Sequence, residues 1–108
     1  MANTFKLKTK ASVGVSTENV YVVPAATTTT VIGITLANRS GSSINVGIGV
    51  TRASEDDVNI LKTVPIPQGS SLEVMAGNKL VLETTDTLTA ISDVASSLDV
   101  SVSILELT

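Results

Sequence analysis

Hydrophobic and polar residues alternate along most of this chain with a period of two. The clearest runs are residues 30–37, where Ile32, Ile34 and Leu36 share one side, and residues 44–50. Alternation of this kind places successive side chains on opposite faces of a strand, so both runs are predicted to be half-buried β-strands. Residues 38–43, rich in serine and glycine, favour a turn. We therefore predict that the two runs form a hairpin.

The same alternation recurs from one end of the chain to the other, and no run favours a helix longer than one turn. Valine, isoleucine and threonine supply 38 of the 108 residues, which also favours strands. We predict roughly eight strands in a single antiparallel β-sandwich over residues 1–108, immunoglobulin-like or jelly-roll-like. The further runs are residues 5–8, 11–15, 19–23, 58–64, 71–75, 80–82, 87–91 and 98–104.

The residue types that carry most enzyme chemistry are missing. Cysteine, histidine and tryptophan are all absent, which excludes disulfides, thiolate nucleophiles, the usual zinc ligands and Ser-His machinery. The acidic residues 55–57 lack the spacing of a calcium loop and are read as a solvated turn. We expect no enzymatic activity, no cofactor and no bound metal.

Charge and aromatic content narrow the possible partners. The net charge is −3, and Phe5 and Tyr21 are the only aromatic residues. An acidic chain with so few stacking side chains is not expected to bind nucleic acid. The scarcity of aromatic residues also argues against carbohydrate binding. Tyr21, flanked by valines, is predicted to lie in the core or at its boundary.

The basic residues are unevenly distributed. Lys6, Lys8 and Lys10 lie within the first ten residues, whereas residues 11–108 carry four basic and ten acidic residues. Alternation places the three lysines on one side of a strand, where the simplest interpretation is a solvated face. The alternative is a basic arm that docks on an acidic neighbour, such as an adjacent subunit.

Two glycines, Gly47 and Gly49, alternate with Ile48 and Val50 in the second strong strand pattern. Small residues on an outward face accommodate twist, a bulge or a neighbouring loop, or else form a closely packed surface between subunits. They do not form a dinucleotide-binding loop, because a third glycine and a following helix are missing.

Targeting signals are also missing from the sequence. The longest apolar run, residues 20–26, contains Pro24 and is far shorter than the ~20 residues of a membrane-spanning helix. The first residues lack the apolar core of a signal peptide. We expect synthesis in a cytoplasm and no membrane partner, and Met1 together with the closing strand favours a complete chain.

Three segments resemble small structural proteins of tailed bacteriophages, notably those that infect marine bacteria and cyanobacteria. They are residues 20–38, residues 64–74 and residues 95–106. The resemblance covers nearly the whole chain but consists of strand patterns without a catalytic signature. It implies a β-sandwich virion component without enzymatic activity, and it supplies no site residues.

These observations lead to a functional hypothesis with open alternatives. We expect a phage capsid decoration or cement protein located in the virion. It would be a homo-oligomer, for example a trimer, and its partner would be the major capsid protein. Lys6, Lys8, Lys10, Gly47 and Gly49 are the candidate partner-binding residues. The alternatives are a tail, neck or baseplate component that contacts tail proteins, or a module that binds the host surface.

Overall fold

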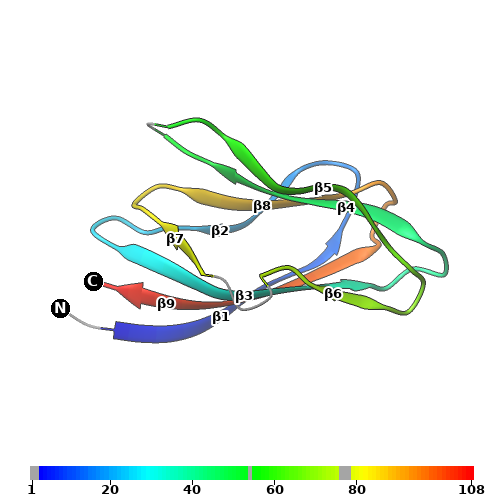
Figure 1. Cartoon of the computed structure of the whole chain (residues 1–108), viewed down its shortest axis with the longest axis horizontal. Coiled ribbons are helices and arrows are strands. Elements are labelled where there is room, and N and C mark those ends of the chain that lie inside the picture. Colours follow the sequence, from blue (N-terminus) through cyan, green and yellow to red (C-terminus); the bar gives the residue numbers. More distant parts are fainter. Residues whose placement is uncertain (1–2, 54, 76–78) are drawn as a thin grey trace.

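The chain folds as a sandwich of two antiparallel sheets, as Figure 1 shows for this computed structural model. The structure describes residues 3–53, 55–75 and 79–108. Within these ranges there are nine strands and no helix. The molecule is elongated, with extents of 45 × 25 × 21 Å. The predicted all-β, antiparallel sandwich is therefore confirmed.

Sheet A contains the two ends of the described chain. Its strand order is β1-β9-β3-β6, and β7 also pairs with β3, so that β6 and β7 together occupy one broken strand position. The long strands β1 and β3 each pair with β9 along most of their length, which makes β9 the centre of the sheet. The bounds are β1 (Asn3–Val13), β9 (Leu98–Leu107), β3 (Thr28–Asn38), β6 (Ser71–Glu73) and β7 (Leu80–Leu82).

Sheet B packs against sheet A and has the order β2-β8-β4-β5. Its edge strand β5 is one residue longer than β4, with nine residues against eight. The register between the two strands shifts between Val46 and Ile48 and again between Ile48 and Gly49. Within β5, Thr63 has a φ of 57°, a conformation typical of a local bulge. The bounds are β2 (Glu18–Val22), β8 (Thr87–Ser92), β4 (Ile44–Thr51) and β5 (Val58–Ile66).

Successive strands mostly alternate between the two sheets, which is the arrangement of a jelly roll. The predicted hairpin between residues 30–37 and 44–50 is wrong. These runs are β3 and β4, and they lie in different sheets, where β3 pairs with β9, β6 and β7 while β4 pairs with β5 and β8. Ile34 and Leu36 of the first run and the alternating apolar residues of the second face the core, so facing one another across it satisfies the same alternation as pairing would. Ile32 was predicted to share the side of Ile34 and Leu36, but the register shift between Val31 and Gly33 turns it to the outer face.

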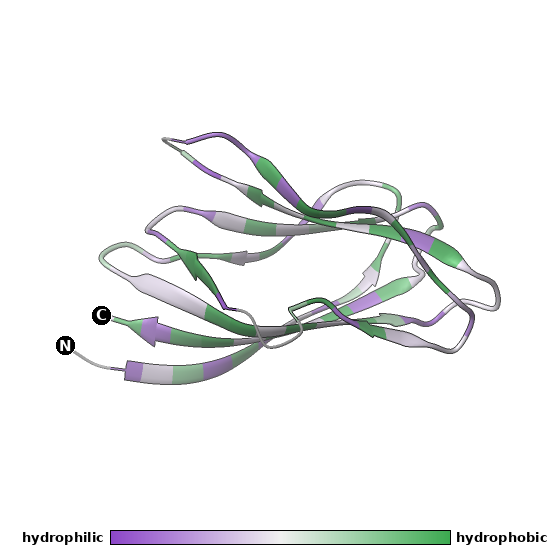
Figure 2. Ribbon diagram, viewed as in Figure 1, coloured by the Kyte–Doolittle hydropathy of each residue, from purple (hydrophilic) through white to green (hydrophobic). Residues whose placement is uncertain are grey.

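The core lies between the sheets and is built from aliphatic side chains. Figure 2 shows hydrophobic and polar bands alternating along the strands. Tyr21, 6% exposed, is the only aromatic residue of this cluster, which confirms its predicted core position. The largest fully buried side chains include Ile34, Leu36, Ile48, Leu88, Leu98 and Ile104.

The first strand is longer than predicted. Residues 5–8 and 11–15 were expected as separate runs, but β1 continues from Asn3 to Val13. The pairing with β9 shifts between Lys10 and Val13, and Ser12 within that shift has a φ of 58°. A bulge therefore connects the two runs and turns the side chain of Val13 into the core, where it is fully buried.

Candidate functional site

The three lysines of β1 share one side of the strand, but that side faces the interior of the sandwich. Lys6, Lys8 and Lys10 are paired in register with Ile104, Val102 and Val100, all of which are buried. Residues opposite one another on neighbouring strands point to the same side of a sheet. Because β1 is an edge strand, the long lysine side chains reach water around the edge.

Two of these lysines already have partners within the chain. The Lys6 Nζ atom lies 2.8 Å from Oε1 of Glu106, and the Lys10 Nζ atom lies 3.5 Å from Oε1 of Glu18. Lys8 has no ion pair among the described residues and is half-buried. The docking role predicted for the lysine triplet stays a prediction, with Lys8 the ammonium group most available to a partner.

Glu106 is the centre of a buried polar network at the end of the sandwich near the chain termini. The Tyr21 hydroxyl donates a hydrogen bond of 2.5 Å to Oε2 of Glu106 and lies 2.8 Å from Oγ1 of Thr29. The Lys6 ammonium, and after it the Tyr21 hydroxyl, lowers the pKa of Glu106. Burial, reinforced by the hydrogen bond to Glu106, raises the pKa of Tyr21 from 10.0 to about 12. The network ties β1, β2, β3 and β9 together.

The outward side of β1 is apolar, the reverse of what a solvated lysine face would give. Phe5 and Leu7 are 74% and 64% exposed. Phe5 lies opposite Leu105 of β9, which lies opposite Thr30 of β3, which lies opposite Val81 of β7. Val81 is itself 60% exposed, so this row, which we call the apolar row, crosses all four strand positions of sheet A with one polar member, Thr30. We call Phe5, Leu7, Ile32, Val81, Leu105 and Leu107 the terminal patch.

The outer face of sheet A is also nearly free of charge. Its central strands present threonine, serine and alanine beside the terminal patch. Among the paired residues of sheet A, register places Asp99 and Glu73 on this face as charged groups. Asp99 lies away from the terminal patch, whereas the Glu73 carboxylate reaches the position beside Gly33, next to Ile32 of that patch. The exposed Lys79 directly precedes β7. Asp99 is paired with Arg39 at 3.2 Å. Exposed apolar patches on uncharged surfaces are typical of protein interaction sites.

The sequence contains a signal for the terminal patch. After Ile104 the alternation places Leu105 and Leu107 on the opposite side from Ile104. Both ends of the chain therefore bring large side chains to the outer face. Phe5 and Leu7 alternate with lysines in the same way. Alternation alone cannot say which side of β1 faces inward, because the inner side at an edge strand has access to water.

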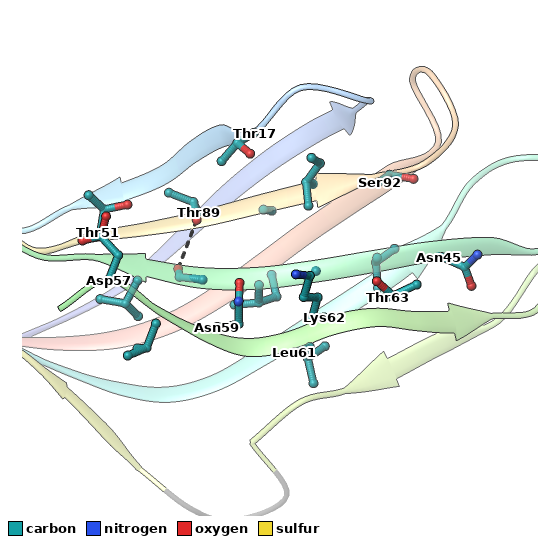
Figure 3. A pocket seen from close by; sticks show the side chains of 18 of the residues that line it. Thr17, Asn45, Thr51, Asp57, Asn59, Leu61, Lys62, Thr63, Thr89 and Ser92 are labelled. Atoms are coloured by element: carbon teal, nitrogen blue, oxygen red, sulfur yellow. Dashed lines mark hydrogen bonds between the residues drawn. The ribbon is translucent and has the colours of Figure 1, made fainter.

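Gly47 and Gly49 lie on the outer face of sheet B, on the floor of a groove of about 460 Å³ (Figure 3). A Cβ atom at Gly47 would lie 3.2 Å from Cγ2 of Ile91 and 3.3 Å from the carbonyl oxygen of Leu61. At Gly49 it would lie 3.2 Å from the carbonyl oxygen of Val58. The glycines therefore accommodate the bulged strand β5, which is the first of the two interpretations given above.

The groove presents hydroxyl and amide groups together with a few charges. Figure 3 shows Asn59, Thr63 and Thr89 among its labelled side chains, with the Thr89 hydroxyl donating to the Gly49 carbonyl oxygen at 3.2 Å. Lys62, Asp57 and Asp93 also line it. None of the described lining residues is aromatic. The groove could hydrogen-bond a polar ligand or an extended chain.

Two other kinds of site are absent from the described part of the chain. No group of three or more acidic residues there could hold a metal ion. No helix in those ranges is long and apolar enough to cross a membrane.

No protein-family model matches this chain, and no curated protein matches it at a significant level. A solved structure with a similar fold comes from Bacillus endospore appendages, described as "a novel family of disulfide-linked pili". The two share 10% sequence identity and a TM-score of 0.56, over 99% of this chain and 87% of the other. At this identity the likeness shows the fold alone. This chain has no cysteine.

Proposed function

We propose that this chain is a non-enzymatic structural subunit of a tailed-phage virion that decorates the capsid surface. The observation that carries the structural role is the outer face of sheet A, where the terminal patch exposes large apolar side chains on a nearly uncharged surface. Such a surface is costly to leave in water and is stabilised when a neighbouring subunit covers it. The assignment to a phage capsid rests on the sequence resemblance.

A second candidate is a subunit of a tail or another fibre. It is supported by the fold likeness to the pilus protein of Bacillus endospore appendages. Subunits of this chain would have to associate without the disulfides named for that protein, since cysteine is absent.

Quantitative mass spectrometry of purified particles, with heads and tails separated, tests the proposal. We expect a high copy number in the head fraction. A low copy number confined to the tail fraction would replace decoration by the tail candidate. Absence from both fractions would overturn the virion proposal.

A further inference from the structure

The apolar row of the terminal patch has a symmetry that suits a second copy of the same chain. Register places Phe5, Leu105, Thr30 and Val81 level with one another on four neighbouring strand positions. The two outer members are the most exposed, at 74% and 60%. Consider a two-fold axis that runs parallel to the strands, midway between β9 and β3. A second copy related by this axis would place its Val81 over Phe5 of the first. The same rotation places its Thr30 over Leu105.

The charges around this face fit the same rotation. Glu73 of β6 and Thr9 of β1 lie at the same level across the sheet, because the register joins them through Thr35 and Ser101. Thr9 lies between Lys8 and Lys10 in the sequence. The rotation brings Lys8 of each copy, which has no ion pair among the described residues, near Glu73 of the other. Since the lysines point to the inner side of β1, this attraction acts over about a Debye length, ~8 Å, and orients the two copies without forming a contact.

Association through the face is favoured over association through the free edge of β1. Pairing of β1 with a second β1 would set the lysines of one copy among those of the other, and like charges on paired strands are destabilising. Lysine on an edge strand is a common protection against such pairing. The face beside it carries no comparable run of like charges among its paired residues, because Asp99 is paired with Arg39 and Glu73 accepts a hydrogen bond from the Thr35 hydroxyl.

The size of the face approaches that of a standard interface. The long strands β1, β9 and β3 span about 36 Å by about 14 Å, and the three residues each of β6 and β7 add about 20 Å of a fourth strand. The footprint is therefore about 600 Å², compared with the ~800 Å² that each partner buries in a standard interface.

We propose that two copies of this chain associate through the outer faces of sheet A, with Phe5 of each copy packed on Val81 of the other. The interface is two-fold and closes on itself, so it gives a dimer. A trimer would need two different surfaces. The inference goes beyond the proposed function and does not depend on the particle in which the protein resides.

Chemical cross-linking tests the pairing directly, because the chain has no cysteine to compete. Facing sheets lie about 10 Å apart, too far for a disulfide, so a short bis-maleimide is the appropriate reagent. We expect a covalent dimer when Phe5→Cys and Val81→Cys variants are mixed, and little when either variant is treated alone. Val15→Cys provides the matched control, since Val15 is 62% exposed and lies beyond the end of β1 that is remote from Phe5.

A charge exchange tests the same contact without a reagent. In sedimentation velocity, Phe5→Lys and Val81→Glu should each weaken dimerisation by about tenfold or more, and a mixture of the two should recover it. Circular dichroism checks that both variants stay folded. Efficient cross-linking of Phe5→Cys with itself, equal cross-linking of the Val15→Cys control, or a monomer at every concentration of the unmodified chain would overturn the interface. A monomer that is nevertheless found in virions would leave the proposed function intact.

Discussion

Replacing Lys6 by glutamine removes the only cation that contacts the buried carboxylate of Glu106 among the described residues. Removing one partner of a fully buried ion pair costs about 3–5 kcal/mol. The Lys6 side chain is 42% exposed, so water screens the pair, and a glutamine amide can still donate a hydrogen bond. We therefore expect Lys6→Gln to lower the free energy of unfolding by about 1–2 kcal/mol near neutral pH.

The effect should depend on pH in a defined direction. The pKa of Glu106 is lowered in the folded chain, so its contribution is complete above the usual value of 4.5 and is lost as pH falls through the lowered value. The difference between the unmodified chain and Lys6→Gln should accordingly shrink in acid, where Glu106 becomes protonated.

Urea unfolding followed by circular dichroism, at neutral pH and at successive pH values below 4.5, measures both effects. Lys8→Gln is the matched control, since Lys8 lies on the same side of β1 without an ion pair among the described residues, and its effect should stay within about 0.5 kcal/mol. Equal losses for Lys6→Gln and Lys8→Gln, or a loss for Lys6→Gln that persists in acid, would refute the reasoning.

Three further predictions concern the buried Tyr21, the glycines of the groove and the lysines of β1. Because the pKa of Tyr21 is raised from 10.0 to about 12, stability should fall as pH rises through that interval, and Tyr21→Phe should flatten this alkaline decline in thermal unfolding scans. Gly49→Ala should cost about 1 kcal/mol in urea unfolding, whereas Gly41→Ala, with open space around the added methyl group, should be nearly neutral; equal effects would contradict the groove geometry. If the lysines guide particle binding, Lys8→Gln with Lys10→Gln should weaken that binding and flatten its salt dependence on either side of about 0.15 M ionic strength, and binding that is unchanged at every salt concentration would remove them from the docking surface.

The sequence identified the strands well but not their partners. Runs such as residues 44–50 and 87–91 became β4 and β8 almost unchanged, because a period of two is a local property of a strand with one buried side. Residues 38–43 were predicted to form a turn, and residues 39–43 form the bent connection between β3 and β4. Whether two such strands share a sheet or face each other across a core is decided by the other strands, and β9, distant in sequence, took the place beside β3.

The candidate site was predicted in part. The sequence placed Lys6, Lys8 and Lys10 on one side of a strand, and the structure confirms that common side. It could not say that this side turns toward Glu106, because the carboxylate is a hundred residues away in the chain and meets Lys6 only through the pairing of β1 with β9. The terminal patch on the other side went unrecognised for the same reason.

By itself the sequence determined an all-β chain with one aliphatic core, no cysteine or histidine chemistry and an acidic balance outside its first residues. These properties follow from residue types and local alternation, which act within a few residues of each position. The tertiary structure alone decided the jelly-roll order of the strands, the ion pair of Lys6 with Glu106 and the apolar row from Phe5 to Val81. Each of these joins residues far apart in the chain, and such contacts form only when burial of the whole core selects one arrangement of strands.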